Sequence, residues 1–373
     1  MPDPPARPGG WRAWRNRLAA SRGFQSWASR MPVLRGRARR EGAALFDLVA
    51  GFAQSQVLRA LVELEILHTL REGPQDAADL APQVGLTEDR TRLLLDAGTA
   101  LGLLERTRGG YLATARGAAL LGVPGLEAMI LHHEVLYRDL ADPVALLRGT
   151  AETELAAFWP YVFGAGAAED PGQAARYSAL MADTQALVAE EALRHLRLDG
   201  VRHLMDVGGG TGVFLAHAAR AAPGARLTLF DLPHVADAAR SRFAAEGLAE
   251  RTTVVPGSFR DGPLPPGADA ISLVRVLYDH ADATVAALLA KVAAALPPGG
   301  RVIVAEPMTG GARPHVPGDV YFALYCLAMR TGRARSAAEI AALLAAAGFA
   351  DIRVRRTDRA YVTGVVEARR PLA

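Results

Sequence analysis

The chain has a single cysteine, Cys326, among 373 residues. One thiol cannot form a disulfide within the chain, and it cannot supply the several thiolates of a cysteine-based metal site. This scarcity excludes a disulfide-stapled scaffold and a zinc-cysteine site, and we expect no metal. A buried structural thiol is the simplest interpretation of Cys326.

Long apolar runs are also missing. No stretch of about 18 consecutive apolar residues occurs, and the N-terminus lacks the apolar segment of a signal peptide, so we expect no membrane span. Hydrophobic residues make up 50% of the chain and charged residues 22%, a composition typical of globular proteins. We therefore expect a cytoplasmic protein that is long enough for two domains.

Acidic residues are scarce near the N-terminus, where residues 1–40 carry ten Arg and one Asp. Three of the four tryptophans lie there too: Trp11, Trp14 and Trp27. One interpretation is a basic amphipathic arm that rests on the anionic lipid of the inner membrane. The other is an arm packed on the body of the protein or on a partner subunit.

Residues 44–120 follow the order of a winged helix. Two apolar helices come first, then a helix that ends near Gly85, a helix capped by Thr87, and a hairpin that turns at Gly109-Gly110. A DNA-binding winged helix needs a basic second helix. Because the segment 87–101 is net acidic, we expect a dimerisation module and no nucleic-acid partner.

The C-terminal part alternates strands with helices. We expect strands at about 203–207, 226–230, 252–255, 269–277, 301–305, 351–356 and 361–368. The first five should be parallel, and the last two should form a hairpin across 358–360. This predicts an α/β fold with a doubly wound methyltransferase sheet, and three regions: an arm over 1–40, a helical domain over 41–170 and a Rossmann-like domain over 171–373.

A glycine-rich turn follows the first of these strands, in HLMDVGGGTGVFLAHAA (203–219). Nicotinamide-binding loops need a third glycine at the position that Val213 occupies here. The run G-G-G-T-G after a strand ending in Asp206 instead indicates S-adenosylmethionine. We expect Gly208 and Gly210 to line its site, with Asp206 bracing the loop.

Polar side chains end the next strands as well. Asp231 is placed to accept both ribose hydroxyls, although a helix N-cap is the alternative role. Ser258 and Phe259, in PGSF, are placed to flank an adenine ring. The strand in VRVLYDHAD (274–282) ends at Tyr278, Asp279 and His280, where an open α/β sheet places its active site.

Five motifs in this order, DVGGGTG, FDLP, PGSF, RVLYDH and VIVAEP, resemble the small-molecule O-methyltransferases typified by plant caffeate and flavonoid enzymes. The resemblance covers roughly residues 45–368. The N-terminal run is similar to the purple-bacterial branch that methylates acyclic carotenoids of the hydroxyneurosporene and demethylspheroidene type. It implies a photosynthetic bacterium, a homodimer, S-adenosylmethionine as methyl donor and a lipophilic hydroxylated carotenoid as substrate.

The resemblance also implies site residues. It groups Arg275 with the cofactor residues, and it places Ser258 where the plant enzymes have Asp. For the substrate it implies Met181. Side chains that recur at helical spacing are candidates for the wall of a lipophilic pocket, with ordinary core as the alternative: Tyr321, Phe322, Tyr325 and Met329. Phe158 is a further candidate for the same pocket. The pair His132 and His133 has two interpretations: it reaches the mouth of a pocket, or it lies at the surface, as paired histidines in a helix more often do.

The family's general base is a His in a His-Asp-Trp run, which is replaced here by Tyr278-Asp279-His280. Of the two acids that brace that base, Glu306 matches and the second position is Ala334. A phenol has a pKa of about 10 and gains from a base, whereas a tertiary alcohol attacks while still protonated and loses its proton late. The replacement therefore favours an alcohol substrate.

We assign Tyr278 to orienting the hydroxyl, with Asp279 or His280 taking the proton, and Glu306 completing the catalytic set. The alternative is that Tyr278 only packs and water removes the proton. Rival functions are methylation of a bacteriochlorophyll-type tetrapyrrole or a polyketide phenol, and a protein that binds S-adenosylmethionine without methylating.

Overall fold

The computed structural model describes residues 10–157 and 184–372. The chain divides into two compact units, Met1–Ala118 and Ala119–Ala373. Each unit is described by itself. The expected domain boundary at residue 170 lies outside the described residues and stays a prediction.

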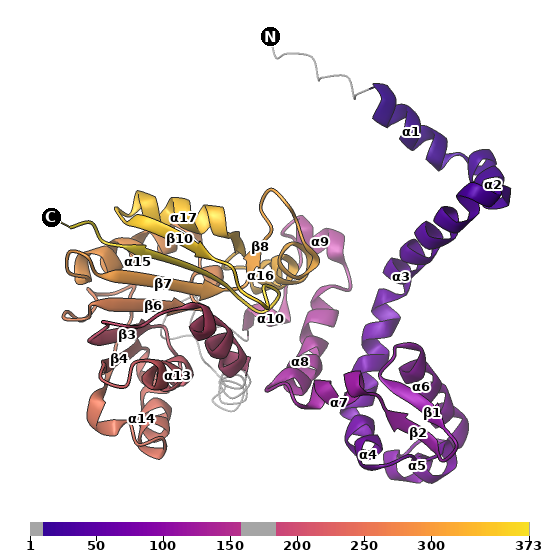
Figure 1. Ribbon diagram of the computed structural model, residues 1–373, viewed down its shortest axis with the longest axis horizontal. Coiled ribbons are helices and arrows are strands. Elements are labelled where there is room, and N and C mark those ends of the chain that lie inside the picture. The colour runs from indigo at the N-terminus through magenta and orange to yellow at the C-terminus, as the bar shows by residue number, and fades with distance from the viewer. Residues whose placement is uncertain (1–9, 158–183, 373) are drawn as a thin grey trace. The chain divides into compact units, whose positions relative to one another are not determined.

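The first unit is helical with one small hairpin (Figure 1). Its elements follow the predicted winged-helix order, and Gly85 ends α5 with a left-handed φ of 67°. They are α1 (Gly10–Ala20), α2 (Arg22–Arg30), α3 (Pro32–Glu63), α4 (Ile66–Glu72), α5 (Ala77–Val84), α6 (Glu88–Ala100), β1 (Leu104–Thr107), β2 (Gly110–Ala113) and α7 (Ala115–Leu121), which continues into the second unit.

Helix α3 is longer than expected. It starts at Pro32, a residue suited to a first helical turn, and runs without a break to Glu63. Residue 40, the expected end of the arm, therefore lies inside this helix, because Gly36 and Gly42 lower helix propensity without breaking it.

Part of α3, Leu34–Glu63, is long and apolar enough to cross a membrane, with a mean hydropathy of 1.3 and 11% of the window buried. Scattered Gly, Ser and Gln residues interrupt the run of apolar residues, but the mean hydropathy of the helix remains high. A helix whose apolar face packs on another chain has the same length and hydropathy.

The second unit is built on a seven-stranded sheet of order β10-β11-β7-β6-β3-β4-β5. Strands β3 to β7 pair in parallel, and β11 joins β7 and β10 in antiparallel fashion, as predicted. The strands are β3 (His203–Val207), β4 (Arg226–Asp231), β5 (Thr252–Pro256), β6 (Ala270–Val274), β7 (Arg301–Glu306), β10 (Ala350–Arg355) and β11 (Gly364–Arg369).

Helices cover both faces of this sheet (Figure 1). One core places α15 (Asp282–Ala295) and α17 (Ala337–Ala346) against strand residues such as Ile271 and Val302. The other core places α13 (Val213–Ala221), α14 (Ala236–Ala245) and the helix over 184–195 against residues such as Leu204 and Ile303. Short 3-10 turns, η1 (Pro233–Val235) and η2 (Ala249–Arg251), complete the connections around α14.

Strand β6 stops at Val274, three residues before the predicted end. Arg275 takes a left-handed φ of 58°, which turns the chain out of the sheet into a 3-10 turn, η3 (Leu277–Asp279). Such a conformation is costly for a side chain other than glycine and must be held by its surroundings. The hairpin loop over 356–363 is also longer than predicted.

A small helical layer packs near this turn. Helix α16 (Ala323–Met329) contacts η3, α8 (Leu126–Asp139), α9 (Pro143–Leu147) and α10 (Glu154–Ala157). It follows a π-helical turn, η4 (Pro317–Phe322), and two short strands pair nearby, β8 (Met308–Thr309) and β9 (Arg335–Ser336).

Candidate active site

The glycine loop between β3 and α13 has the backbone conformation that its sequence predicts. Gly208 and Gly210 both adopt left-handed φ values, 73° and 58°. A Cβ on Gly208 would lie 2.8 Å from Val276 Cγ2, whereas the corresponding direction at Gly210 is open. The loop is therefore tight on the side of β6 and open at Gly210, a shape that admits a ligand close to the backbone.

Asp206 lies beneath this loop and is completely buried. Its Oδ1 accepts a hydrogen bond of 2.5 Å from Ser272 Oγ, and its Oδ2 has no partner among the described residues. A Cβ on Gly209 would come within 2.2 Å of that Oδ2. Burial raises the pKa of Asp206 to about 7, against the hydrogen bond from Ser272. These contacts support the predicted role of Asp206 in bracing the glycine loop.

Asp231, at the end of β4, lies beside the loop. Its Oδ2 accepts from the Gly210 backbone nitrogen at 2.6 Å, and its Oδ1 accepts from the Leu232 nitrogen at 2.6 Å. Burial raises the pKa of this carboxyl, against those two hydrogen bonds. The carboxylate thus lies at the open end of the loop, where the resemblance expects the ribose hydroxyls.

Phe259 and His280 form an aromatic corner. Their rings meet edge to face with centroids 5.2 Å apart, and His280 Nδ1 lies 3.2 Å from an Arg260 nitrogen. Ser258 Oγ accepts from the Arg260 backbone nitrogen, which turns the loop after β5. Burial lowers the pKa of His280 to about 4. The imidazole therefore shares a wall with the residues expected near adenine.

Tyr278 is 2% exposed, and the guanidinium of Arg275 lies close enough to act on its hydroxyl. Burial raises the pKa of the phenol above its ordinary value of 10, so the hydroxyl stays protonated. Arg275 also donates to Thr184 Oγ1 at 2.9 Å, on the helix over 184–195. Tyr278 and Arg275 thus link the end of β6 to that helix.

Two buried ionic side chains hold the η3 turn from opposite sides. Glu306 Oε2 accepts from the backbone nitrogens of Leu277 and Tyr278, at 2.9 and 3.2 Å. Arg335, also fully buried, donates to the carbonyls of Leu277 and His280, at 2.7 and 2.8 Å. Glu306 and Arg335 together form a clamp on the backbone of the η3 turn, and the position of Tyr278 depends on this clamp.

Burial favours the protonated, neutral form of the two acids near the turn, Glu306 and Asp279. Burial raises the pKa of Glu306 to about 7, and it raises that of Asp279 well above 3.8. In the described structure Asp279 Oδ1 and Glu306 Oε1 have no hydrogen-bond partner. Their negative charges also repel each other, which favours protonation further.

The position of the family's second bracing acid is apolar. Ala334 packs with Tyr278 and Cys326, and Phe322 lies against the same cluster. Cys326 is buried, as expected, and burial raises the pKa of its thiol. The Tyr278 side chain thus packs against an apolar cluster at this position.

The aromatic candidates for the substrate pocket lie on η4 and α16. Tyr321 and Phe322 meet edge to face at 4.8 Å, and Tyr321 and Tyr325 lie 6.0 Å apart, measured between ring centroids. Their hydroxyls meet two histidines of α8, because His132 Nε2 lies 3.1 Å from Tyr325 Oη and His133 Nε2 lies 2.7 Å from Tyr321 Oη. The two histidines are half-buried and contact these tyrosines, which favours the first of their two interpretations over a surface role.

Met181 and Phe158 lie outside the described residues, so their predicted place beside the substrate stays a prediction. Arg335 and the two histidines were not recognised from the sequence as site residues. The paired His132-His133 was a visible signal, but nothing in the sequence marks Arg335.

One cluster has the residue types of a metal site: Glu191, His195 and Asp358. The carboxylate of Glu191 is already bound by Arg359, at 2.8 Å, and by the Arg359 backbone nitrogen, at 2.9 Å. Positive charge from that guanidinium would oppose a cation, so the cluster locks the β10–β11 loop to the helix over 184–195.

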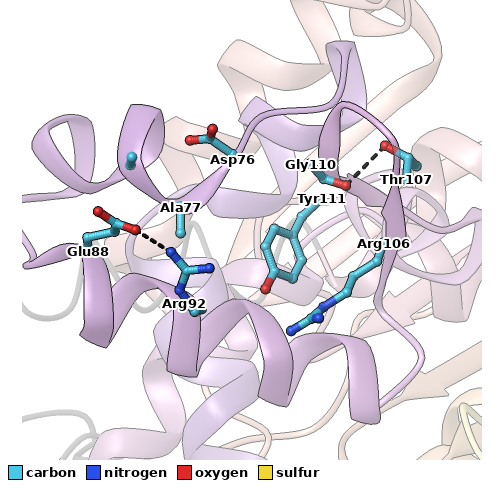
Figure 2. A pocket seen from close by; sticks show the side chains of 9 residues that line it. Asp76, Ala77, Glu88, Arg92, Arg106, Thr107, Gly110 and Tyr111 are labelled. Carbon is cyan, nitrogen blue, oxygen red and sulfur yellow. Dashed lines mark hydrogen bonds and ion pairs between the residues drawn. The ribbon is translucent and has the colours of Figure 1, made fainter.

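A pocket of about 250 Å³ lies in the first unit, between α5, α6 and the hairpin. Figure 2 shows Arg92 paired with Glu88 and Arg106 beside Tyr111 at its wall. Arg106 also pairs with Asp96, which accepts from the Tyr111 hydroxyl. The pocket's cations are matched by its own anions, and it contains none of the predicted site residues.

Known families cover most of the chain. Residues 137–350 match the O-methyltransferase domain, and residues 46–122 match the O-methyltransferase dimerisation domain. The dimerisation domain supports a homodimer.

Two similar relatives are both named demethylspheroidene O-methyltransferase. The one from Cereibacter sphaeroides is 61% identical over 99% of this chain and 98% of its own length. The one from Rhodobacter capsulatus is 52% identical over 95% and 88%.

Solved structures of the same fold include mitomycin 7-O-methyltransferase, with a TM-score of 0.75, 27% identity, and coverage of 90% of this chain and 99% of that one. Human N-acetylserotonin methyltransferase in complex with S-adenosylmethionine has a TM-score of 0.71 and 28% identity, with coverage of 89% and 98%. Together with the loop, the carboxylate of Asp231 and the η3 turn, these matches show that the chain belongs to the S-adenosylmethionine-dependent O-methyltransferase family.

Proposed function

We propose that this enzyme transfers a methyl group from S-adenosylmethionine to the terminal tertiary hydroxyl of an acyclic carotenoid, of the hydroxyneurosporene or demethylspheroidene type. The names of its two full-length relatives support this substrate class and do not favour the rival tetrapyrrole, phenol or non-methylating functions. The observation that carries the proposal is the buried Tyr278 beside Ala334, in the place of an imidazole and its acid.

The residues that would hold the methyl donor are Asp231, at the ribose, and the open glycine loop, with Asp206 beneath it. Ser258 and Phe259 would flank the adenine, and Arg275 would complete the set. When bound, S-adenosylmethionine supplies an electrophilic methyl carbon on a sulfonium. The fit rests on the open space at Gly210 and on the two Asp231 oxygens that lie beside it.

Tyr278 would orient the substrate hydroxyl through its own hydroxyl, with the guanidinium of Arg275 nearby. Holding the oxygen in line with the methyl carbon and excluding water would then lower the barrier without prior deprotonation. Glu306 would act indirectly, because its carboxylate holds the backbone of the turn rather than the phenol.

The two groups expected to take the proton are less well suited to that task. Asp279 is held near its neutral form by burial, and a neutral carboxyl is a poor acceptor. His280 directs Nδ1 at Arg260 and packs its ring on Phe259, on the adenine wall. A different acceptor is therefore worth seeking.

The substrate would lie against Tyr321, Phe322 and Tyr325, together with Met181 and Phe158. A carotenoid is located in the membrane, and the N-terminal arm would bind the enzyme to the membrane surface from the cytoplasm. Trp11 and Trp14 stack at 4.9 Å on α1 and are 69% and 47% exposed, and Trp27 on α2 is 50% exposed. With the arginines around them, they suit the anionic surface of the inner membrane.

The test compares substrate classes. The protein is incubated with methyl-labelled S-adenosylmethionine and, separately, a 1-hydroxylated acyclic carotenoid, its non-hydroxylated analogue, a catechol and a chlorophyllide. We expect label only in the first. Label in the catechol or the chlorophyllide would contradict the proposal, and so would cofactor binding without turnover on the hydroxylated polyene.

A further inference from the structure

The helical layer around α16 contains two parallel hydrogen-bonded pairs, each joining an imidazole of α8 to a phenol. The pairs are His132 with Tyr325, at 3.1 Å, and His133 with Tyr321, at 2.7 Å. An imidazole and a phenol in contact can pass a proton between them, because each group is both donor and acceptor. The established family chemistry does not use either pair.

Of the two pairs, the one with Tyr325 lies closer to the η3 turn. Tyr325 is 5% exposed and precedes Cys326, whose side chain packs on Tyr278. Tyr325 lies on α16, the helix that contacts η3. Tyr321 lies on η4 and is less buried.

We propose that Tyr325 and His132 are the proton acceptor of the methyl transfer, an inference that rests on the proposed function. Tyr325 Oη would donate its hydrogen to His132 Nε2 and accept a hydrogen bond from the substrate hydroxyl. Tyr325 is then a catalytic residue, and His132, which acts through it, is a positioning residue that receives the proton.

The step balances as follows. The hydroxyl oxygen forms a bond to the methyl carbon while the carbon–sulfur bond breaks, and its electron pair stays on sulfur. The proton of the resulting oxonium moves to Tyr325 Oη, and the hydrogen of Tyr325 moves to His132 Nε2. The products are the ether, the neutral thioether and an imidazolium, which later releases its proton to water.

A weakly basic imidazole is sufficient for this task. Burial lowers the pKa of His132, so the ring is neutral and ready to accept at physiological pH. A protonated dialkyl ether is a far stronger acid than imidazolium, so the transfer is downhill even to a poor base. A phenol substrate, which must be deprotonated before attack, would gain much less from such an acceptor.

The test uses single-turnover rates of the full-length protein with S-adenosylmethionine and the hydroxylated carotenoid. We expect Tyr325→Phe and His132→Gln to lower the rate about 100-fold and about 10-fold. The matched variants Tyr361→Phe and His68→Gln, at exposed residues outside the site, should stay within about twofold of the wild type. Added imidazole should restore part of the rate to His132→Ala and none to Tyr325→Phe.

Affinity for the carotenoid without the methyl donor provides a second readout, from quenching of protein fluorescence. All four variants should bind within about threefold of the wild type, because the apolar polyene provides most of the area buried on binding. Equal rates in all five proteins would overturn the relay and leave the proposed function intact. No turnover by the wild type would overturn both.

Discussion

The buried carboxylate of Glu306 is bonded to the backbone of Tyr278, not to its side chain. Glu306 Oε2 lies 3.2 Å from the Tyr278 nitrogen, and the guanidinium of Arg275 is the charged group near the phenol. The acid therefore shapes the turn, while the Tyr278 side chain packs with Ala334.

Tyr278→Phe tests the orienting role of the hydroxyl. We expect turnover to fall about 10- to 100-fold, because the substrate oxygen loses its alignment. Stability should fall by about 1–2 kcal/mol, since the guanidinium of Arg275 loses a polar neighbour in a buried site. Initial rates and urea unfolding measure the two effects. Tyr361→Phe, at a 61% exposed residue, is the control and should change neither.

Retention of full turnover by Tyr278→Phe would mean that the side chain only packs. Water or another group would then remove the proton.

Arg335→Leu tests the clamp on the η3 turn. It removes a guanidinium that is fully buried and binds two backbone carbonyls and Asp282. We expect a loss of about 3–5 kcal/mol in the free energy of unfolding, because buried acceptors are left without donors. Arg333→Leu is matched, since Arg333 also pairs with Asp282 but is 46% exposed, and should lose less than about 1 kcal/mol.

Denaturant unfolding of both variants measures the difference. Equal losses would show that the turn does not depend on Arg335.

Gly332→Ala tests how closely the chain packs on this turn. A Cβ at residue 332 would lie 1.9 Å from the Tyr278 carbonyl oxygen, and a backbone atom cannot move aside as a side chain can. We expect a loss of about 1–3 kcal/mol and a parallel loss of turnover. Gly224→Ala, where the added methyl meets nothing within 4 Å, should be neutral or slightly stabilising.

Thermal unfolding measures the stability of both glycine variants, and rate measurements give their turnover. A Gly332→Ala protein as stable as the wild type would contradict the packing described here.

Glu306→Gln tests the pH dependence of stability. Folding raises the pKa of Glu306 from 4.5 to about 7, so its contribution is complete below about pH 4.5 and is lost as pH rises through 7. The amide side chain of the Glu306→Gln variant does not ionise, so the variant does not lose this contribution to stability as pH rises. Relative to the wild type, Glu306→Gln should therefore gain about 2 kcal/mol between pH 5.5 and pH 8. Urea unfolding at both pH values measures this.

Glu339→Gln is the control for that experiment. Hydrogen bonds from Ser336 lower the pKa of Glu339 to about 2, so its contribution is present above pH 4.5 and is lost only as pH falls towards 2. Its difference from the wild type should be the same at pH 5.5 and pH 8. A pH-independent Glu306→Gln difference would show that the carboxyl is not perturbed.

Replacing Trp11, Trp14 and Trp27 together by alanine tests the membrane arm in the full-length protein. We expect binding to vesicles with anionic lipid to fall about tenfold or more, because the exposed rings lose their contact with the interface. Binding should also weaken at high salt, since the arginines are screened. Flotation measures the bound fraction, with Tyr361→Ala as control.

Equal flotation of the triple variant and the wild type would show that the arm serves another partner. The exposed apolar side chains of α3, such as Phe46 and Phe52, would then be the surface to test next.

Local sequence patterns determined much of this protein. Alternating apolar segments with turn residues between them predicted the strands and their pairing, because side-chain periodicity and chain connectivity are local properties. The glycines at 208 and 210 and the carboxylates at 206 and 231 were recognisable, since backbone conformation and strand ends constrain residue type directly.

Only the tertiary structure decided what these side chains contact. It turned His280 towards Phe259, bonded Arg335 to the Leu277 carbonyl across 58 residues, and joined His132 to Tyr325 across 193. Such contacts depend on how helices and turns pack over long separations, and a sequence pattern carries no record of them. Burial, which sets the pKa of Asp279 and Glu306, is likewise a property of the folded chain alone.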